Sequence, residues 1–151
     1  MKLPEPILKH SIGVAEFMAD YAEKHNADPF QYYVTGLLHD IGKLFPNKTE
    51  TRPYKGHAQK GGELLRELGF NNYKEILHHG HPEDGYFSTL WLVLNLADLS
   101  INGKGETIPI AARLTDIRQR YGEESEEYEN AIKMTNILID NHIIRKDYTI
   151  I

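Results

Sequence analysis

The chain has 151 residues, 40% hydrophobic and 26% charged, a balance typical of one globular domain rather than a disordered segment. It contains no cysteine, which excludes disulfides and thiolate metal ligands, and its net charge of −5 disfavours a protein that coats long nucleic acid. The N-terminus lacks the pattern of a signal peptide, and the longest apolar run, Leu90 to Ile101, is too short to cross a bilayer. We therefore expect one domain over residues 1–151, in the cytoplasm and without a membrane partner.

The first two predicted helices carry the first candidate metal ligands. From Ile7 to Lys24 the apolar residues recur at helical spacing, and His10 falls on their face. Asp28-Pro29 is a typical helix start, and the second helix is predicted to run to His39 or slightly beyond. An imidazole and a carboxylate both bind divalent transition metals, and neighbours on a helix point about 100° apart. One ion lying between these directions could therefore bind both His39 and Asp40.

A basic segment follows this pair. Residues 44 to 56 include two prolines and are predicted to form a long loop, which in a small domain is often a lid or a binding loop. Between Lys43 and Lys60 five basic residues face one acidic residue, Glu50, so the segment has a net charge of 5 − 1 = +4. It is interpreted either as solvated surface or as a lid that contacts phosphates. In the second case the substrate-binding residues would be Lys43, Lys48, Arg52 and Lys55.

Histidines mark the next two predicted helices. His57 begins the third helix on the same face as its leucines, and Gly61-Gly62 on this helix indicates either close backbone approach or an ordinary packing need. A short fourth helix is expected to continue into a group of three histidines within four residues. We expect one or two of the three to bind metal, with His79 favoured and His78 and His81 as alternatives.

The remaining chain is also predicted to be helical. Residues 88 to 101 are nearly all apolar, and their length favours a buried helix over a strand. Asp98 is the single carboxylate in this run, and burying it requires a cation, a metal or hydrogen bonds. Pro109 begins a sixth helix and Ser125 caps the last one. The prediction is thus an all-α bundle of about six or seven helices, with a motif-bearing core at about 7–105 and C-terminal helices at about 109–145.

The ordered set of His10, His39-Asp40 and Asp98 resembles the HD-domain metal-dependent phosphohydrolases. The form Leu-Leu-His-Asp-Ile-Gly-Lys, followed by Gly56-His57 and then His78-His79, resembles the branch with extra histidines. That branch includes dinuclear enzymes such as the bacterial symmetrical diadenosine tetraphosphate hydrolases and, more remotely, the HD-GYP cyclic-di-GMP phosphodiesterases. The resemblance extends over roughly residues 7 to 105.

The resemblance implies one or two divalent ions, with Fe, Mn, Co, Ni, Zn or Mg as candidates. The implied ligands are His10, His39, Asp40, His57, His79 and Asp98, with catalytic roles for His39, Asp40 and Asp98. Asp40 is the candidate bridge because a carboxylate has two oxygens.

The expected function is hydrolysis of a phosphomonoester, phosphodiester or phosphoanhydride by metal-activated water, in a nucleotide or another small phosphorylated substrate. His81 and Glu83 are candidate general acids, and a homodimer is compatible with the sequence. Three alternatives stay open: a nucleotide-binding regulatory protein without turnover, a di-iron oxygenase, and a helical protein whose histidines are structural.

Overall fold

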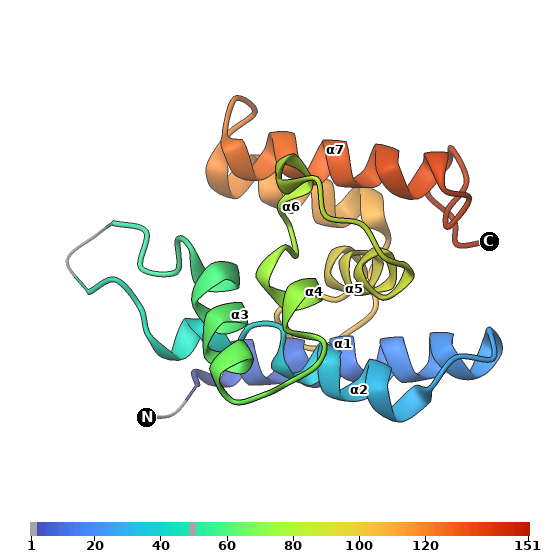
Figure 1. Ribbon diagram of the computed structural model, residues 1–151. Helices are drawn as coiled ribbons and strands as arrows, with labels where there is room; N and C mark the ends of the chain where they lie inside the picture. Colours follow the sequence, from blue (N-terminus) through green and yellow to red (C-terminus); the bar gives the residue numbers. More distant parts are fainter. Residues whose placement is uncertain (1–2, 49–50) are drawn as a thin grey trace.

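The structure is a computed structural model that describes residues 3–48 and 51–151, and these residues are helical throughout the core (Figure 1). In chain order the elements are α1 (Glu5–Lys24), α2 (Pro29–Leu38), the 3-10 helix η1 (Ile41–Leu44), α3 (His57–Glu67), α4 (Tyr73–Leu77), the 3-10 helix η2 (Pro82–Asp84), α5 (Thr89–Ser100), α6 (Ile110–Tyr121) and α7 (Glu126–Asp140). Among the described residues, extended pairing is limited to two isolated bridges, Ile101 with Thr107 and Ile144 with Ile150. The predicted all-α fold is confirmed.

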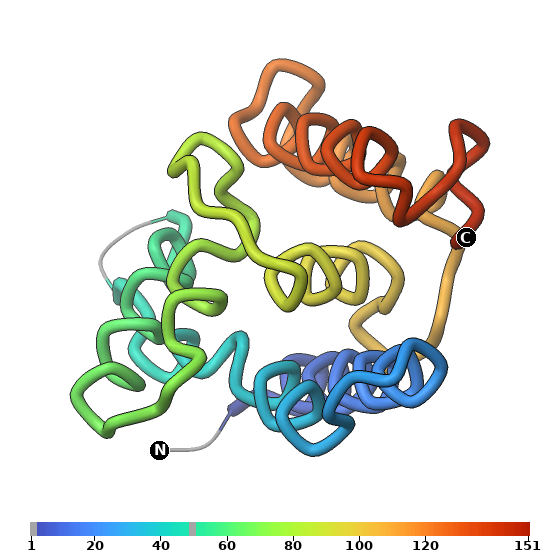
Figure 2. Tube along the Cα trace, turned by 45° about the vertical axis from the view of Figure 1, so that its right-hand side comes forward, coloured from blue at the N-terminus to red at the C-terminus, as the bar shows by residue number. Residues whose placement is uncertain are grey.

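Helix α5 is the centre of the bundle. It lies between the α1–α2 pair on one side and the α6–α7 pair on the other (Figure 2). Ten of its 12 residues are buried, as expected for a helix that is apolar on all sides. Val93, Leu94 and Ala97 face the core shared with α1 to α4, whereas Leu92, Leu96 and Leu99 face the core shared with α6 and α7. Helix α5 therefore lies between the two hydrophobic cores and contributes side chains to both.

Close packing of α1 on α2 brings two predicted ligands together. A Cβ atom on Gly36 would lie 2.9 Å from the Cα of Ala15, so a side chain at position 36 would force the helices apart. The Asp28 side chain caps α2 by accepting a hydrogen bond from the Phe30 amide at 3.0 Å. As a result the His10 and His39 rings have centroids 5.2 Å apart.

Glycine also permits the close approach of η1, α3 and α4. A Cβ on Gly42 would lie 1.9 Å from the carbonyl oxygen of His57, and a Cβ on Gly62 would lie 2.3 Å from the Cβ of Leu77. The close backbone approach that Gly61-Gly62 indicated is therefore present at Gly62. This packing sets the first residue of α3 and the end of α4 beside the His39-Asp40 pair.

Two helix ends differ from their predicted positions. Helix α5 ends at Ser100, two residues before Asn102-Gly103, because Ile101 is extended and pairs with Thr107. Helix α4 ends at Leu77, so His78 is its C-cap and His79 lies beyond it. Both ends place backbone groups at the site described below. None of the helices in the described ranges has the length and apolar character needed to span a membrane.

Candidate metal centre

Asp40 is the point at which the predicted ligands meet. Its side chain is almost completely buried, and its two oxygens face different histidines. Oδ2 lies 3.2 Å from His39 Nε2 and 3.8 Å from His10 Nε2. Oδ1 lies 3.0 Å from His57 Nε2 and 3.4 Å from His79 Nε2. The carboxylate thus stands between two groups of nitrogen donors, which is the arrangement that a bridging ligand requires.

The first ligand group consists of His10, His39, Asp40 and Asp98, from α1, the end of α2 and α5. Asp98 Oδ1 lies 2.8 Å from His10 Nε2 and 3.5 Å from His39 Nε2. The donor atoms of His10, His39 and Asp40 are close enough to one another to surround a single ion, and those of Asp98, His39 and His79 form a further set of the same kind.

The second ligand group consists of Asp40, His57 and His79, from the α2–η1 junction, the start of α3 and the segment after α4. The two Nε2 atoms of His57 and His79 lie 3.3 Å apart. Two nitrogens bound about 2.1 Å from one ion are expected to lie about 3.0–3.4 Å apart. The spacing therefore suits joint ligation of one ion.

All four histidines are oriented in the same way. Each donates its Nδ1–H to a backbone carbonyl: His10 to Asn102 at 3.2 Å, His39 to Gly36 at 2.7 Å, His57 to Tyr54 at 3.0 Å and His79 to Ile76 at 2.5 Å. A carbonyl can only accept, so Nδ1 carries a proton and Nε2 is the ring nitrogen that faces the Asp40 side. The sequence did not reveal these acceptors, because backbone carbonyls have no residue signature. A local signal exists, since three of the four lie three residues before their histidine.

The charges at the centre balance one another. Burial lowers the pKa of His39, but the carboxylates of Asp40 and Asp98 outweigh this effect and raise it to about 10. Burial raises the pKa of Asp40, but His39 and Lys43 hold it well below its usual range. Burial also raises the pKa of Asp98, but the neighbouring His10 and His39 outweigh this effect and keep that pKa well below its usual range. In metal-free protein the positive charges of a protonated His39 and of Lys43 therefore offset the two carboxylates.

The residues present fit a divalent transition metal. His39 Nε2 is buried and, among the described residues, has no aligned hydrogen-bond partner. A buried polar atom of this kind is costly unless it is satisfied, and coordination to an ion would satisfy it. Mixed imidazole and carboxylate donors suit Fe, Mn, Co, Ni and Zn, and they do not select one of these metals.

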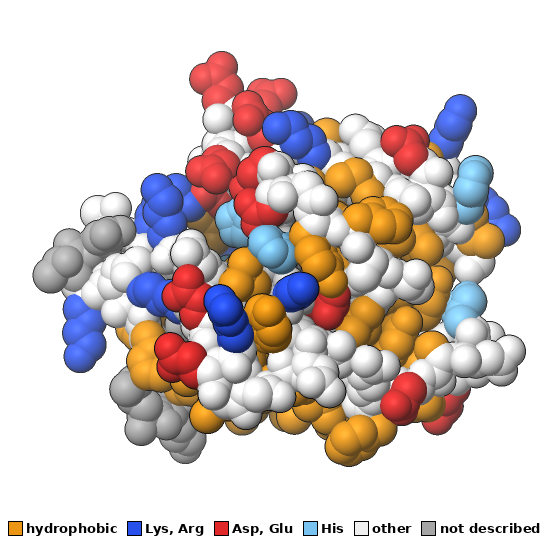
Figure 3. Space-filling view, in the orientation of Figure 1, with side chains coloured by type: hydrophobic (Ala, Val, Ile, Leu, Met, Phe, Trp, Pro, Cys, Tyr) orange, Lys and Arg blue, Asp and Glu red, His pale blue; other side chains and the backbone are white. Residues whose placement is uncertain are grey.

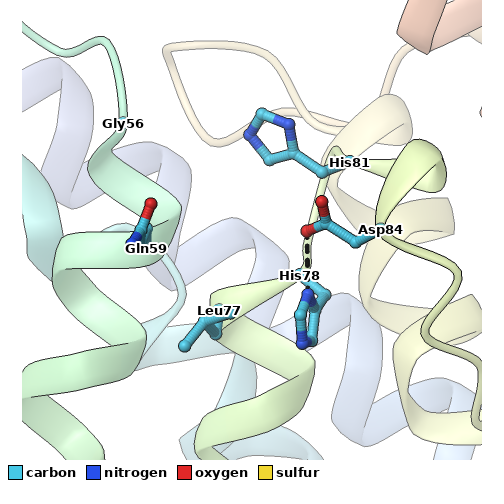
Figure 4. Close-up of a pocket in the computed structure, with 6 residues that line it drawn as sticks. All are labelled: Gly56, Gln59, Leu77, His78, His81 and Asp84. Carbon is cyan, nitrogen blue, oxygen red and sulfur yellow. Dashed lines mark hydrogen bonds and ion pairs between the residues drawn. The ribbon is translucent and has the colours of Figure 1, made fainter.

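The other two histidines of the cluster have carboxylate partners of their own. His78 Nδ1 lies 2.8 Å from Asp84 Oδ2, and the His78 ring stacks on Tyr86 at a centroid distance of 5.0 Å. His81 Nδ1 lies 2.7 Å from Glu83 Oε1. Figure 4 shows the His78–Asp84 pair with His81 above it. Of the three histidines, the structure places His79 beside Asp40 and turns His78 and His81 toward Asp84 and Glu83.

The predicted substrate-binding residues occupy different places. Lys43 Nζ lies 3.2 Å from Asp40 Oδ2, so this lysine is part of the centre. Arg52 forms an ion pair with Glu127 at the start of α7, which ties the loop to the C-terminal helices. Lys48 and Lys55 are exposed on the same loop. Glu50, the acidic residue of the segment, lies outside the described residues.

Metal binding should release a proton from His39. Because the pKa of His39 is raised to about 10 in the metal-free protein, this imidazole is protonated at pH 8 and must lose its proton to become a ligand. Adding Mn²⁺ to metal-free protein at pH 8 should therefore release about one proton per chain, measured with a pH indicator in weak buffer.

His39→Asn provides the control for this measurement, since it removes the proton donor at the same position. Equal proton release from wild type and from His39→Asn would show that His39 is not the protonated ligand.

The comparisons with known proteins agree with this geometry. The family model of the HD domain matches residues 7–136, and the chain belongs to this family. Membership implies a metal-dependent phosphohydrolase and a divalent metal held by the His and Asp clusters.

Curated relatives include proteins named ribonuclease Y. The chain is 32% identical over 127 residues to that of Lawsonia intracellularis, which covers 82% of this chain and 22% of the relative. It is 35% identical over 80 residues to that of Pseudothermotoga lettingae, covering 51% of this chain and 15% of the relative. With Fusobacterium nucleatum the identity is 40% over 63 residues, covering 42% of this chain and 12% of the relative. The chain thus spans less than a quarter of each of these relatives. No solved structure matches it significantly.

Proposed function

We propose that the protein hydrolyses a phosphoester or phosphoanhydride bond in a nucleotide or another small phosphorylated substrate, with a pair of divalent ions held on the two sides of Asp40. The observation that carries this proposal is the division of the Asp40 oxygens between two groups of donors. When bound, such a metal pair supplies an activated water and neutralises the phosphoryl oxygens. The remaining contributions come from the chain's own residues.

One side of the centre is open to a substrate. The side chains of His39, Asp40 and His79 are at most 3% exposed, whereas those of Lys43, His57 and Asp98 are 22%, 26% and 26% exposed. A phosphate would reach the centre from this side, where Lys43 can bind a phosphoryl oxygen as a point charge. Burial lowers the pKa of Lys43, but the Asp40 and Asp98 carboxylates outweigh it and raise this pKa, so the side chain is cationic. His10 and His39 contact Asp98 from the buried side of the centre and hold it in place.

A pocket of about 380 Å³ adjoins the second ligand group (Figure 4). Its lining residues are Gly56, Gln59, Leu77, His78, His81 and Asp84. Gly56 directly precedes His57, and His78 directly precedes His79, so the pocket and the ligands share the same chain segments. Figure 3 shows histidine side chains reaching the surface near α4, with acidic side chains gathered above them. The volume is at the lower end of the range of small-molecule sites.

The substrate class is supported by charge and by the relatives. The net charge of −5 disfavours a long nucleic acid, and the +4 segment from Lys43 to Lys60 favours several phosphates close to the metals. The relatives' name, ribonuclease Y, refers to cleavage of RNA, and this makes a phosphodiester between nucleotides a candidate bond. We favour nucleotides, dinucleotides and short oligonucleotides.

A substrate panel tests the proposal. Protein purified without a His-tag is loaded with Mn, Fe, Co, Ni or Mg and assayed with nucleoside mono-, di- and triphosphates, dinucleoside polyphosphates, cyclic dinucleotides, a short RNA and an aryl phosphodiester. We expect metal-dependent release of phosphate or nucleotide from at least one compound. His39→Ala should lower the rate by about 100-fold or more, since even outer-shell substitutions typically cost 10–100-fold.

His25→Ala is the matched control, because His25 stacks on Tyr21 at the end of α1 and has no place in the centre. The hydrolase proposal is rejected if fully metallated protein turns over none of the compounds and His39→Ala and His25→Ala behave alike.

A further inference from the structure

We propose that Asn95 is a positioning residue that holds His79 in the second ligand group through the Gly80 amide, while Trp91 holds the His78 carbonyl on the other side of that histidine. The inference rests on the two-metal centre proposed above. It concerns a residue that in the sequence only interrupts an apolar run.

Two buried side chains of helix α5 form hydrogen bonds to the backbone on either side of His79. The Gly80 amide donates to Asn95 Oδ1 at 2.8 Å, and the Trp91 indole Nε1–H donates to the His78 carbonyl at 3.0 Å. Asn95 Nδ2 in turn donates to the Trp91 carbonyl at 2.8 Å. Thus the carbonyl before His79 and the amide after it are both bound to α5.

The orientation of the Asn95 amide is fixed by its partners. The Gly80 amide can only donate and the Trp91 carbonyl can only accept, so the oxygen and nitrogen of Asn95 cannot be exchanged. Asn95 is 2% exposed and Trp91 is 1% exposed, so water does not substitute for these bonds. Replacing Asn95 by an apolar residue would leave the Gly80 amide without its acceptor.

The His79 segment needs such support because its own helix is short. Helix α4 has five residues and ends at Leu77, and helices of this length are not stable on their own. Gly80 has a φ of +74°, so the backbone turns away directly after the ligand. The local bond to the Ile76 carbonyl orients the His79 ring, whereas the two contacts from α5 hold the backbone on either side of it and so set its distance to Asp40.

The same face of α5 serves both ligand groups. Trp91, Asn95 and Asp98 are spaced at i, i+4 and i+7, which places them along one side of a helix. Asp98 lies in the first group, and Trp91 and Asn95 hold the segment that brings His79 to the second. The helix thus fixes the spacing between the two groups.

The test is a metal titration followed by calorimetry and by the spin-coupled signal of a Mn²⁺ pair. Asn95→Leu removes both amide bonds at similar volume, and Trp91→Phe removes the bond to the His78 carbonyl. We expect each variant to bind the second Mn²⁺ about 10- to 100-fold more weakly, with the first ion bound as in wild type. Thr135→Val is the control, because it removes a buried hydroxyl that bonds to the Ala131 carbonyl within α7.

The outcomes separate this inference from the proposed function. Wild-type protein that binds two ions, with Asn95→Leu and Trp91→Phe binding both equally tightly, overturns the role of Asn95 alone. An equal loss for both ions, or an equal loss in Thr135→Val, also overturns it, because a general loss of stability would explain the result. Wild-type protein that binds fewer than two ions overturns the two-metal centre and this inference together. If Asn95→Leu does not fold, Trp91→Phe decides.

Discussion

Asp40→Asn should abolish stable binding of both metal ions. The substitution keeps the volume of the side chain, but it removes the negative charge and replaces one of the two oxygens that face His39 and His57. Because removal of outer-shell partners alone costs about 10–100-fold in metal affinity, loss of a shared ligand should lower the affinity at both positions by at least about 100-fold. Elemental analysis after dialysis against Mn²⁺ measures the effect.

Asp84→Asn is the matched control for this variant. Asp84 is also an aspartate paired with a histidine, with its Oδ2 2.8 Å from His78 Nδ1, but it lies outside both ligand groups. It should retain both ions. Equal metal loss in the two variants would mean that the ligand set around Asp40 is wrong, whereas loss of one ion from Asp40→Asn would mean that the carboxylate does not bridge.

Gly42→Ala should lower the free energy of unfolding by about 3 kcal/mol or more, at the upper end of overpacking effects. The added methyl group would lie 1.9 Å from the His57 carbonyl oxygen and 2.8 Å from the Gly61 amide nitrogen. Both neighbours are backbone atoms, so η1 and α3 must separate. Urea unfolding of metal-free protein measures the loss, and metal titration should show weaker binding because His57 moves away from Asp40.

Gly103→Ala provides the comparison for Gly42→Ala. A Cβ at position 103 meets no atom within 4 Å, and this substitution should change the free energy of unfolding by about 0.5 kcal/mol or less. A similar stability of the two variants would show that η1 and α3 are not in close backbone contact.

The helices were predictable because each has local signals. Asp28-Pro29 and Ser125 are caps that the structure contains as such, and the apolar run of α5 is long enough to exclude a strand. The end of α5 was less predictable, because it depends on pairing of Ile101 with Thr107, which residue spacing does not encode.

The candidate site was predictable in its residue types but not in its arrangement. The order of His10, His39-Asp40 and Asp98 indicated a ligand set, and the structure brings these side chains together with His57 and His79. The sequence could not show how the Asp40 oxygens divide between two groups. It favoured His79 among the three clustered histidines but left His78 and His81 open, because the choice depends on where α4 ends and on contacts from α5.

The ion pair between Arg52 and Glu127 could not be predicted from sequence patterns either. The two residues are 75 positions apart (127 − 52), and no periodicity relates a loop to a distant helix start. The basic loop was interpreted either as solvated surface or as a lid facing phosphates, and one of its cations, Arg52, pairs with Glu127 of α7. Its assignment to substrate binding stays a prediction.

Helix α5 separates the candidate metal centre from the C-terminal helices, because it contributes side chains to both hydrophobic cores. Asp40 and the five candidate ligands around it come from residues 10 to 98, on the side of α1 to α5, whereas α6 and α7 pack on the opposite face of α5. The C-terminal pair approaches the loop beside the centre through Glu127 and Arg52. Substitutions in α6 and α7 are therefore expected to change the position of the basic loop while leaving the candidate metal ligands in place.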